Sequence, residues 1–244
     1  QHGKFRRQRQ MCIRDRLTVA ARILGAGCCL LLPNTPPKGG PAKNIREALG
    51  LGALRILRQR DMAVFFATSL LFSIPLAIFY FHTPLQLGQL KVERIAAWMT
   101  IGQLTEAVAM IFMGWFLTRW RIKWLLAFAM IFGVLRYGLY AVGAGANSPA
   151  IVLLGVAFHG ICWSYFFEAG RVFLQKRVDP DIQAQSQALL TLLTSGIGTL
   201  IGTFALGTLQ RSLVSESTGV GWSFYWWILA AVCAICVLGF IIGY

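Results

Sequence analysis

The sequence predicts an all-α polytopic membrane protein with six transmembrane helices, and three observations support this fold class. Apolar residues make up 57% of the 244 residues and charged residues only 13%, whereas an average soluble domain is about 25% charged. The mean hydropathy is +0.62. Apolar stretches of about 20 residues, enough to cross a hydrocarbon core roughly 30 Å thick, recur along the chain. None alternates as a barrel strand would, so we expect helices, which satisfy their own backbone hydrogen bonds in lipid.

The first 61 residues are expected to lie outside this bundle. Residues 1–16 are polar and basic and contain MCIRDR, which resembles translated sequencing adapter, so we expect this segment to be non-native. Residues 17–33 are apolar but short and include Arg22, the pattern of the end of a truncated transmembrane helix. Residues 34–61 are expected to form a cytoplasmic linker. It begins with a Pro/Gly stretch and ends in an amphipathic helix at the membrane surface.

Residues 62–244 are predicted to form the six-helix transmembrane bundle. The approximate bounds of its helices are 62–86, 95–118, 123–145, 149–174, 185–209 and 222–243. Pro75 falls inside the first helix and Pro84 near its end, and either can kink or break it.

The net charge of +14 comes from basic residues that lie mainly before the first helix and in the gaps between the helices. This distribution does not indicate a nucleic-acid-binding surface. Beyond residue 16, twelve Lys and Arg lie in alternate gaps on one side of the predicted bundle and three on the other. The richer side is expected to be cytoplasmic, which places the C-terminus in the cytoplasm of a multi-pass protein of the inner (plasma) membrane. No basic stripe with interleaved aromatic residues indicates nucleic acid as a partner.

Glu106 lies near the middle of the second predicted helix, with Gln103 on the same face three residues earlier. A charge at that depth costs about 2.5–3.5 kcal/mol on insertion scales, so it usually marks function. The carboxyl suits a proton carrier or a ligand for a polar substrate. The alternative is a packing role between neighbouring helices.

His159, Trp163 and Phe167 follow one another at four-residue spacing in the fourth predicted helix and share a stripe. An aromatic wall with one hydrogen-bonding ring suits a planar polar ligand, although such stripes often serve helix packing alone. Glu168 and Arg171, near the cytoplasmic end, are expected to form an intrahelical ion pair or to snorkel rather than to act in transport.

Two other features are a charged residue with two possible environments and a ridge that indicates helix packing. Arg136, in the third predicted helix, is expected either to pair with a group outside this chain or to snorkel to the headgroups. Thr194, Gly198 and Gly202 recur every four residues in the fifth helix, a small-residue ridge that favours close packing.

No cofactor or metal is expected, and no enzymatic function. Cys233 and Cys236 form a CxxC inside an apolar run, whereas a tetrahedral zinc site needs four ligands. The chain contains no phosphate-binding loop, nucleophile elbow or catalytic triad pattern.

Several motifs, taken in order, resemble the nucleoside:proton symporter family of the major facilitator superfamily. They are LLLPNTPP, IREALGLGALRILRQRDMAVFF, GQLTEA, VLRYGLYA, HGICWSYFFEAG and DIQAQSQALLTLLTSGIGTLIGT, and the resemblance covers roughly residues 24–244. It implies the C-terminal six-helix half of a twelve-helix transporter, with an N-terminal six-helix half as the missing partner.

The resemblance also implies site residues. Gln103 and Glu106 match the family's Gln and Glu in helix eight, which implies roles in substrate binding and proton coupling. Phe81 and Pro84 stand where the family has amides in helix seven. Trp163 and Ser164 stand where helix ten of the family has an aromatic residue followed by Asp.

The first hypothesis is therefore a proton-coupled symporter for nucleosides or a similar polar, ring-bearing solute. In it Glu106 carries the proton and Gln103 bonds the substrate. The rest of the site would be lined by Phe81, His159, Trp163 and Ser164. The alternatives are a sugar or oligosaccharide proton symporter of the same superfamily, and a membrane receptor or scaffold without transport activity.

Overall fold

The computed structural model describes residues 16, 18–33, 51–215 and 219–244. The chain divides into two compact units, residues 1–43 and 44–244. In the first unit the structure describes one short apolar helix, Thr18–Leu30. The expectations for residues 1–15 and for residues 34–50 of the linker lie outside the described residues.

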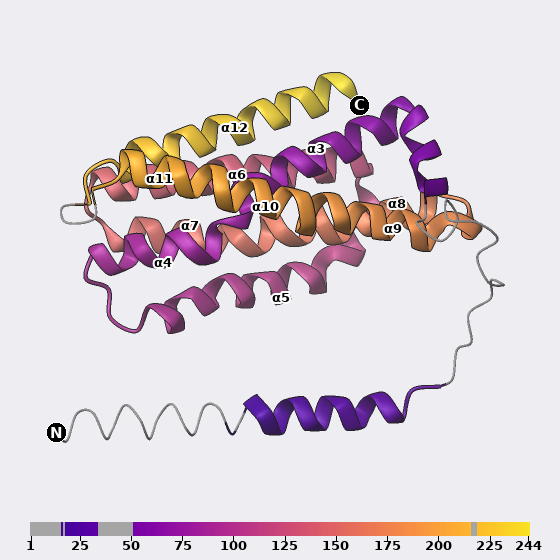
Figure 1. The fold of residues 1–244 in the computed structure, drawn as a ribbon, viewed down its shortest axis with the longest axis horizontal. Helices are drawn as coiled ribbons and strands as arrows, with labels where there is room; N and C mark the ends of the chain where they lie inside the picture. Colours follow the sequence, from indigo (N-terminus) through magenta and orange to yellow (C-terminus); the bar gives the residue numbers. More distant parts are fainter. Residues whose placement is uncertain (1–15, 17, 34–50, 216–218) are drawn as a thin grey trace. The chain divides into compact units, whose positions relative to one another are not determined.

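The second unit contains six apolar helical spans that run alternately in opposite directions (Figure 1). Their bounds are Arg60–Gln89, Ile95–Arg119, Ile122–Gly145, Pro149–Arg177, Pro180–Leu213 and Trp222–Gly243. A 3-10 helix, η1 (Leu51–Arg58), precedes them and buries Ala53 and Ile56. The predicted all-α fold with six membrane-length helices is confirmed.

The first span is broken into α3 (Arg60–Ala77) and α4 (Phe79–Gln89). Pro75 lies inside α3, three residues before the break at Ile78, and a proline ring removes one backbone donor from the helical ladder. The sequence indicated that Pro75 or Pro84 could kink or break this span, and the break lies between the two prolines. Phe79 therefore starts a second helix within the first span.

The fourth and fifth spans contain wider π-helical segments that the sequence did not predict. The fourth consists of α7 (Pro149–Trp163), the π-helix η2 (Ser164–Glu168) and α8 (Ala169–Arg177). The fifth consists of η3 (Pro180–Ile182), α9 (Gln183–Thr191), the π-helix η4 (Leu192–Gly198), α10 (Thr199–Ile201), the π-helix η5 (Gly202–Leu206) and α11 (Gly207–Leu213). Such π segments frequently occur at functional sites.

The small-residue ridge of the fifth span packs against α3. A methyl group on Gly202 would lie 2.5 Å from the carbonyl oxygen of Ile74, and one on Gly198 would overlap the hydroxyl of Ser73. The packing interpretation of this ridge is confirmed, because only residues without a side chain allow the two helices to approach this closely.

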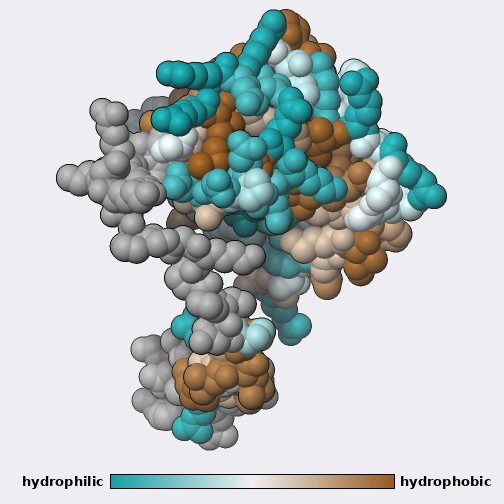
Figure 2. Space-filling view, turned by 90° about the vertical axis from the view of Figure 1, so that its right-hand side faces the viewer, coloured by the Kyte–Doolittle hydropathy of each residue, from teal (hydrophilic) through white to brown (hydrophobic). Residues whose placement is uncertain are grey.

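Polar contacts join the chain segments at the end of the bundle where η1 lies. Arg177 donates to Asp61 over 2.9 Å and joins the start of α3 to the end of α8. Arg60 donates to the carbonyl oxygen of Gly243, at the end of α12 (Trp222–Gly243). Figure 2 views the bundle from this end and shows hydrophilic side chains gathered over the apolar helices. Arg60 and Arg177, from two of the segments predicted to carry the excess of basic residues, therefore lie at the same end.

The spans differ in how far the bundle covers them. In α5 (Ile95–Arg119) only 17% of the most apolar stretch is buried, against 56% in α6 (Ile122–Gly145). α6 is enclosed by α7 and α12, where the ring of Tyr137 stacks on Trp226 with centroids 5.7 Å apart. α5 therefore lies at the open side of the unit and α6 inside it.

Candidate functional site

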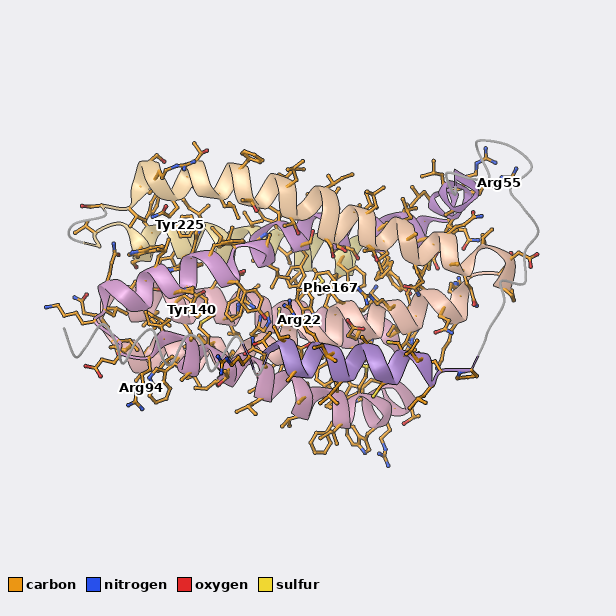
Figure 3. The ribbon with its side chains drawn as sticks, turned by 60° about the horizontal axis from the view of Figure 1, so that its bottom comes forward. Arg22, Arg55, Arg94, Tyr140, Phe167 and Tyr225 are labelled. Carbon is orange, nitrogen blue, oxygen red and sulfur yellow. The ribbon has the colours of Figure 1, made fainter. Side chains whose placement is uncertain are left out.

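A cavity of about 190 Å³ lies where α3, α4, the fourth span and the fifth span come together. Its walls combine aromatic rings with hydroxyl groups and one cation, and they comprise Ser73, Leu76, Ala77, Tyr80, Trp163, Phe167, Arg171, Thr194, Ser195 and Thr199. In Figure 3 Phe167 lies midway along the bundle, between the fourth and fifth spans. Mostly apolar walls with a few polar groups are typical of small-molecule sites. The π-helices η2 and η4 both contribute residues to this cavity.

The aromatic stripe predicted in the fourth span is continuous in the structure. The ring of His159 lies 5.8 Å from that of Trp163, and Trp163 lies 4.7 Å from Phe167. Phe79 extends the stripe, because it stacks on His159 with centroids 4.1 Å apart and planes 11° apart. Since Trp163 and Phe167 line the cavity, the stripe forms one wall of it.

Gln103 and Glu106 lie on α5, the least enclosed of the six spans. Gln103 is exposed, and its side-chain amide donates a hydrogen bond to the hydroxyl of Tyr80 over 3.1 Å. Glu106 is half-buried and forms no ion pair among the residues that the structure describes. Ser164 is fully buried, and its hydroxyl donates to the backbone carbonyl of Glu106 over 3.4 Å.

Close packing of α5 on α7 explains these positions. A methyl group on Gly160 would overlap backbone atoms of Thr105 and Glu106. The absence of a side chain at Gly160 therefore lets the two backbones touch at the level of Glu106. The predicted residues Gln103, Glu106, His159, Trp163 and Ser164 are thus gathered around the α4, α5 and α7 contacts.

Phe81 lies apart from this group. Its side chain is 58% exposed and is not among the residues lining the 190 Å³ cavity. The neighbouring Tyr80 lines the cavity and accepts the hydrogen bond from Gln103. Sequence reasoning missed Tyr80 because Phe81 was chosen from the position at which the family resemblance implies an amide. The signal that was available was the run of aromatic residues directly after Pro75.

Arg136 occupies neither of the two environments expected from the sequence. Its side chain is fully buried, so snorkelling is wrong, and its partners lie within this unit. The guanidinium donates to the hydroxyl of Tyr137 over 2.8 Å and contacts Nδ1 of His159 at 2.9 Å. It also lies 4.8 Å from the ring centroid of Phe79. Aromatic faces attract a desolvated guanidinium, which explains how this cation is held without a carboxylate partner among the described residues.

The predicted ion pair between Glu168 and Arg171 is present, with 3.7 Å between its charged atoms. Arg171 also borders a second, more open cavity of about 660 Å³, which extends along α5, α8 and α9. Cys233 and Cys236 are buried free thiols. Among the described residues no group of three or more His, Cys, Asp or Glu side chains could hold a metal ion.

Comparison with solved structures assigns this architecture to the six-helix half of a major facilitator superfamily transporter. A crystal structure of a mutant of the nucleoside transporter NupG matches with a TM-score of 0.72 and 25% identity, over 88% of this chain and 56% of that chain. A second crystal structure of NupG matches with a TM-score of 0.69 and 24% identity.

The chain belongs to the nucleoside H+ symporter family, whose family model matches residues 10–244. The putative nucleoside transporter YegT of Escherichia coli (strain K12) is 29% identical over 233 residues, which are 93% of this chain and 55% of YegT. The nucleoside permease NupG of the same organism is 26% identical over 86% of this chain and 53% of NupG. A xanthosine permease of that organism is 24% identical over 92% of this chain and 56% of that protein. The chain therefore spans about half the length of these relatives, and it is part of a multi-pass membrane transporter family.

Proposed function

We propose that this chain is half of a secondary transporter that couples the uptake of nucleosides, or of a similar polar ring-bearing solute, to protons. The observation that carries the proposal is the contact of Gln103 with the aromatic wall of Tyr80, His159 and Trp163, one helical turn from Glu106 on α5. A planar base can stack on such a wall, while the amide and the carboxyl satisfy polar groups. Membership of the nucleoside H+ symporter family supports the same reading. It does not favour the sugar symporter or the transport-inactive receptor.

In this proposal Glu106 carries the coupled proton and Gln103 hydrogen-bonds the substrate. Glu106 suits that role because it is half-buried and free of an ion pair among the described residues. His159, Trp163 and Ser164 form the site from the fourth span, whereas Phe81 on α4 lies apart from them and would join the site only with the second half in place. Its exposed ring is free to face a second half.

The transport cycle is proposed to be a rocking of two six-helix halves about a site near the membrane midplane. The exposed side of α5 is then the side that faces the second half, the N-terminal half predicted from the family resemblance. The protein is proposed to lie in the inner membrane, with the basic end of the bundle and the C-terminus in the cytoplasm. Residues 1–244 alone are expected not to transport, and uptake by vesicles containing only this chain would contradict that.

The test is uptake of labelled uridine and adenosine by cells expressing the full-length transporter, with and without a protonophore. We expect protonophore-sensitive uptake that Glu106→Gln abolishes. Glu93→Gln is the matched control, because Glu93 lies in the turn between α4 and α5, outside the spans. With the protein verified in the membrane, absence of uptake of either nucleoside would contradict the proposed substrate class. Equal protonophore sensitivity in Glu106→Gln and the unmodified protein would contradict the role of Glu106.

A further inference from the structure

The contact between Arg136 and His159 determines which nitrogen of the imidazole carries its proton. A guanidinium is permanently charged and has only hydrogen-bond donors. An atom of the His159 ring, Nδ1, lies 2.9 Å from a terminal nitrogen of Arg136, and both side chains are buried. The guanidinium must therefore donate, and Nδ1 must accept and carry no proton.

The geometry around the ring keeps this arrangement in place. Phe79 stacks on the imidazole at 4.1 Å and lies under the guanidinium at 4.8 Å, so one ring supports both partners. A second terminal nitrogen of Arg136 donates to the hydroxyl of Tyr137, which itself donates to the carbonyl oxygen of Pro75. The guanidinium is thus fixed by α6 and by the kinked end of α3. With Nδ1 occupied as an acceptor, a neutral ring carries its proton on Nε2.

The Nε2 atom has no hydrogen-bond partner among the described residues. The side chain of His159 is only 1% exposed and does not itself line the 190 Å³ cavity, so its ring lies behind the residues that do. A buried donor left unpaired costs about 1–3 kcal/mol, which favours an acceptor supplied by a bound molecule. A methyl group on Gly102 would lie 3.3 Å from Cδ2, the carbon beside Nε2, so this edge of the ring faces α5 next to Gln103. The rings of Tyr80 and Trp163, each 5.8 Å from His159, border the edge and line the 190 Å³ cavity.

We propose that Arg136 locks His159 as the neutral Nε2–H tautomer and so makes it a permanent hydrogen-bond donor to the substrate. The substrate must then present an acceptor between Tyr80 and Trp163, such as a carbonyl oxygen, a ring oxygen or a pyridine-type nitrogen. His159 does not carry the coupled proton, which leaves that role to Glu106. Arg136 is a positioning residue that acts through His159. The identity of the ligand rests on the proposed function, whereas the tautomer does not.

The tautomer is tested by ¹⁵N nuclear magnetic resonance of the full-length transporter labelled at histidine. This chain contains three histidines, His2, His82 and His159, and the His159 signal is assigned as the one lost in His159→Phe. The expected spectrum shows an unprotonated Nδ1 and a protonated Nε2 at the pH of the uptake assay. A ring protonated on Nδ1, or on both nitrogens, would overturn the proposal.

Two substitutions of Arg136 distinguish its effect on the His159 tautomer from its effect on packing. Arg136→Lys keeps a donor-only cation and is expected to retain the Nε2–H tautomer. Arg136→Gln supplies both a donor and an acceptor and is expected to give a mixture of tautomers. The signal of His82, which bonds Tyr225 elsewhere in the bundle, reports in each sample whether the fold is retained. If Arg136→Gln shows the same single tautomer as the unmodified protein, Arg136 is not the lock and the proposal is wrong.

Uptake measurements test the role of the donor. His159→Phe keeps a stacking ring but removes the N–H, so KM for the nucleoside is expected to rise about 2- to 12-fold, the value of one hydrogen bond. Sensitivity of uptake to a protonophore is expected to remain. Loss of that sensitivity in His159→Phe would make His159 a proton carrier and overturn the proposal. If the unmodified transporter moves no nucleoside, the proposed function fails, while the resonance spectrum still decides the tautomer.

Discussion

Helices α5 and α6 are consecutive in the chain and both are apolar, yet they hold their ionisable groups in opposite ways. Glu106 on α5 is half-buried, on a helix of which little is enclosed. Arg136 on α6 is completely enclosed, held by Tyr137, His159 and the face of Phe79. Neither forms an ion pair within the described part of the chain.

The difference indicates that the two charges serve different purposes. A group that must exchange a proton or contact a substrate needs access, which the open side of α5 provides. A permanently charged guanidinium enclosed by aromatic rings can exchange nothing and instead orients its neighbours. The comparison therefore supports the proposal that α5 carries the chemistry and α6 positions its neighbours, and substitutions on each helix test it.

The largest effect is expected where α5 touches α7. In Gly160→Ala the new methyl group overlaps backbone atoms of Glu106 and Thr105, which cannot rotate away as a side chain can. Overpacking of this kind costs typically 1–3 kcal/mol, and here we expect about 3 kcal/mol together with displacement of Glu106. The measurement is thermal unfolding in detergent, combined with uptake. Gly114→Ala, on α5 and with no atom within 4 Å of the new methyl, is the control. Equal stability of the two variants would mean that α5 is not fixed by this contact.

The second largest effect is expected from removing a tyrosine hydroxyl, once beside the buried Arg136 and once beside the exposed Gln103. Tyr137→Phe removes a hydroxyl that accepts from Arg136 and donates to the carbonyl oxygen of Pro75. We expect a loss of about 1.5–3 kcal/mol, since hydrogen bonds to buried charged groups are the costly ones to lose. Tyr80→Phe removes the exposed bond from Gln103 and is expected to cost about 0.5 kcal/mol in stability. Thermal unfolding of both variants is the check. A larger loss in Tyr80→Phe would reverse the roles of the two regions.

Much of the fold follows from the sequence because length and hydropathy are local properties. The expected helix 95–118 is observed as Ile95–Arg119 and the expected 123–145 as Ile122–Gly145. Pro75 and Pro84 marked the first span as one that could kink or break for an equally local reason, and the break at Ile78 lies between them. The glycine ridge at Gly198 and Gly202 was predictable as a packing surface, although not its partner.

The candidate site was less predictable, because it depends on angular phase and on partners from distant parts of the chain. The π-helices η2 and η4 change the phase of the fourth and fifth spans, and no sequence pattern marked them. The enclosure of Arg136 depends on Phe79 and His159, which come from two other helices. At the cavity Tyr80 takes the place that the family resemblance implied for Phe81. The substrate-site roles of Gln103 and Glu106 remain predictions.

A third test concerns the aromatic wall beside α5. Trp163→Leu keeps an apolar side chain but removes the ring that lines the cavity, and ring contacts contribute about 0.5–1.5 kcal/mol beyond their buried area. We therefore expect KM for uridine to rise about 2- to 12-fold in the full-length transporter. Trp227→Leu on α12, where the ring is exposed, is the control and is expected to leave KM unchanged. An unchanged KM in Trp163→Leu would indicate that this wall packs helices and does not contact the substrate.

The smallest effect is expected at the end of the bundle where charges are exposed. Asp61 pairs with Arg177 over 2.9 Å and joins α3 to α8, but the side chain of Arg177 is 56% exposed. Water screens such a pair, so Asp61→Asn is expected to cost at most about 1 kcal/mol and to cost less at high salt. Thermal unfolding at low and high salt measures this, with Asp181→Asn as the control, because Asp181 forms no ion pair among the described residues. A loss as large as that of Tyr137→Phe would show that exposure does not decide what a charge contributes here. The contrast drawn between α5 and α6 would then lose its physical basis.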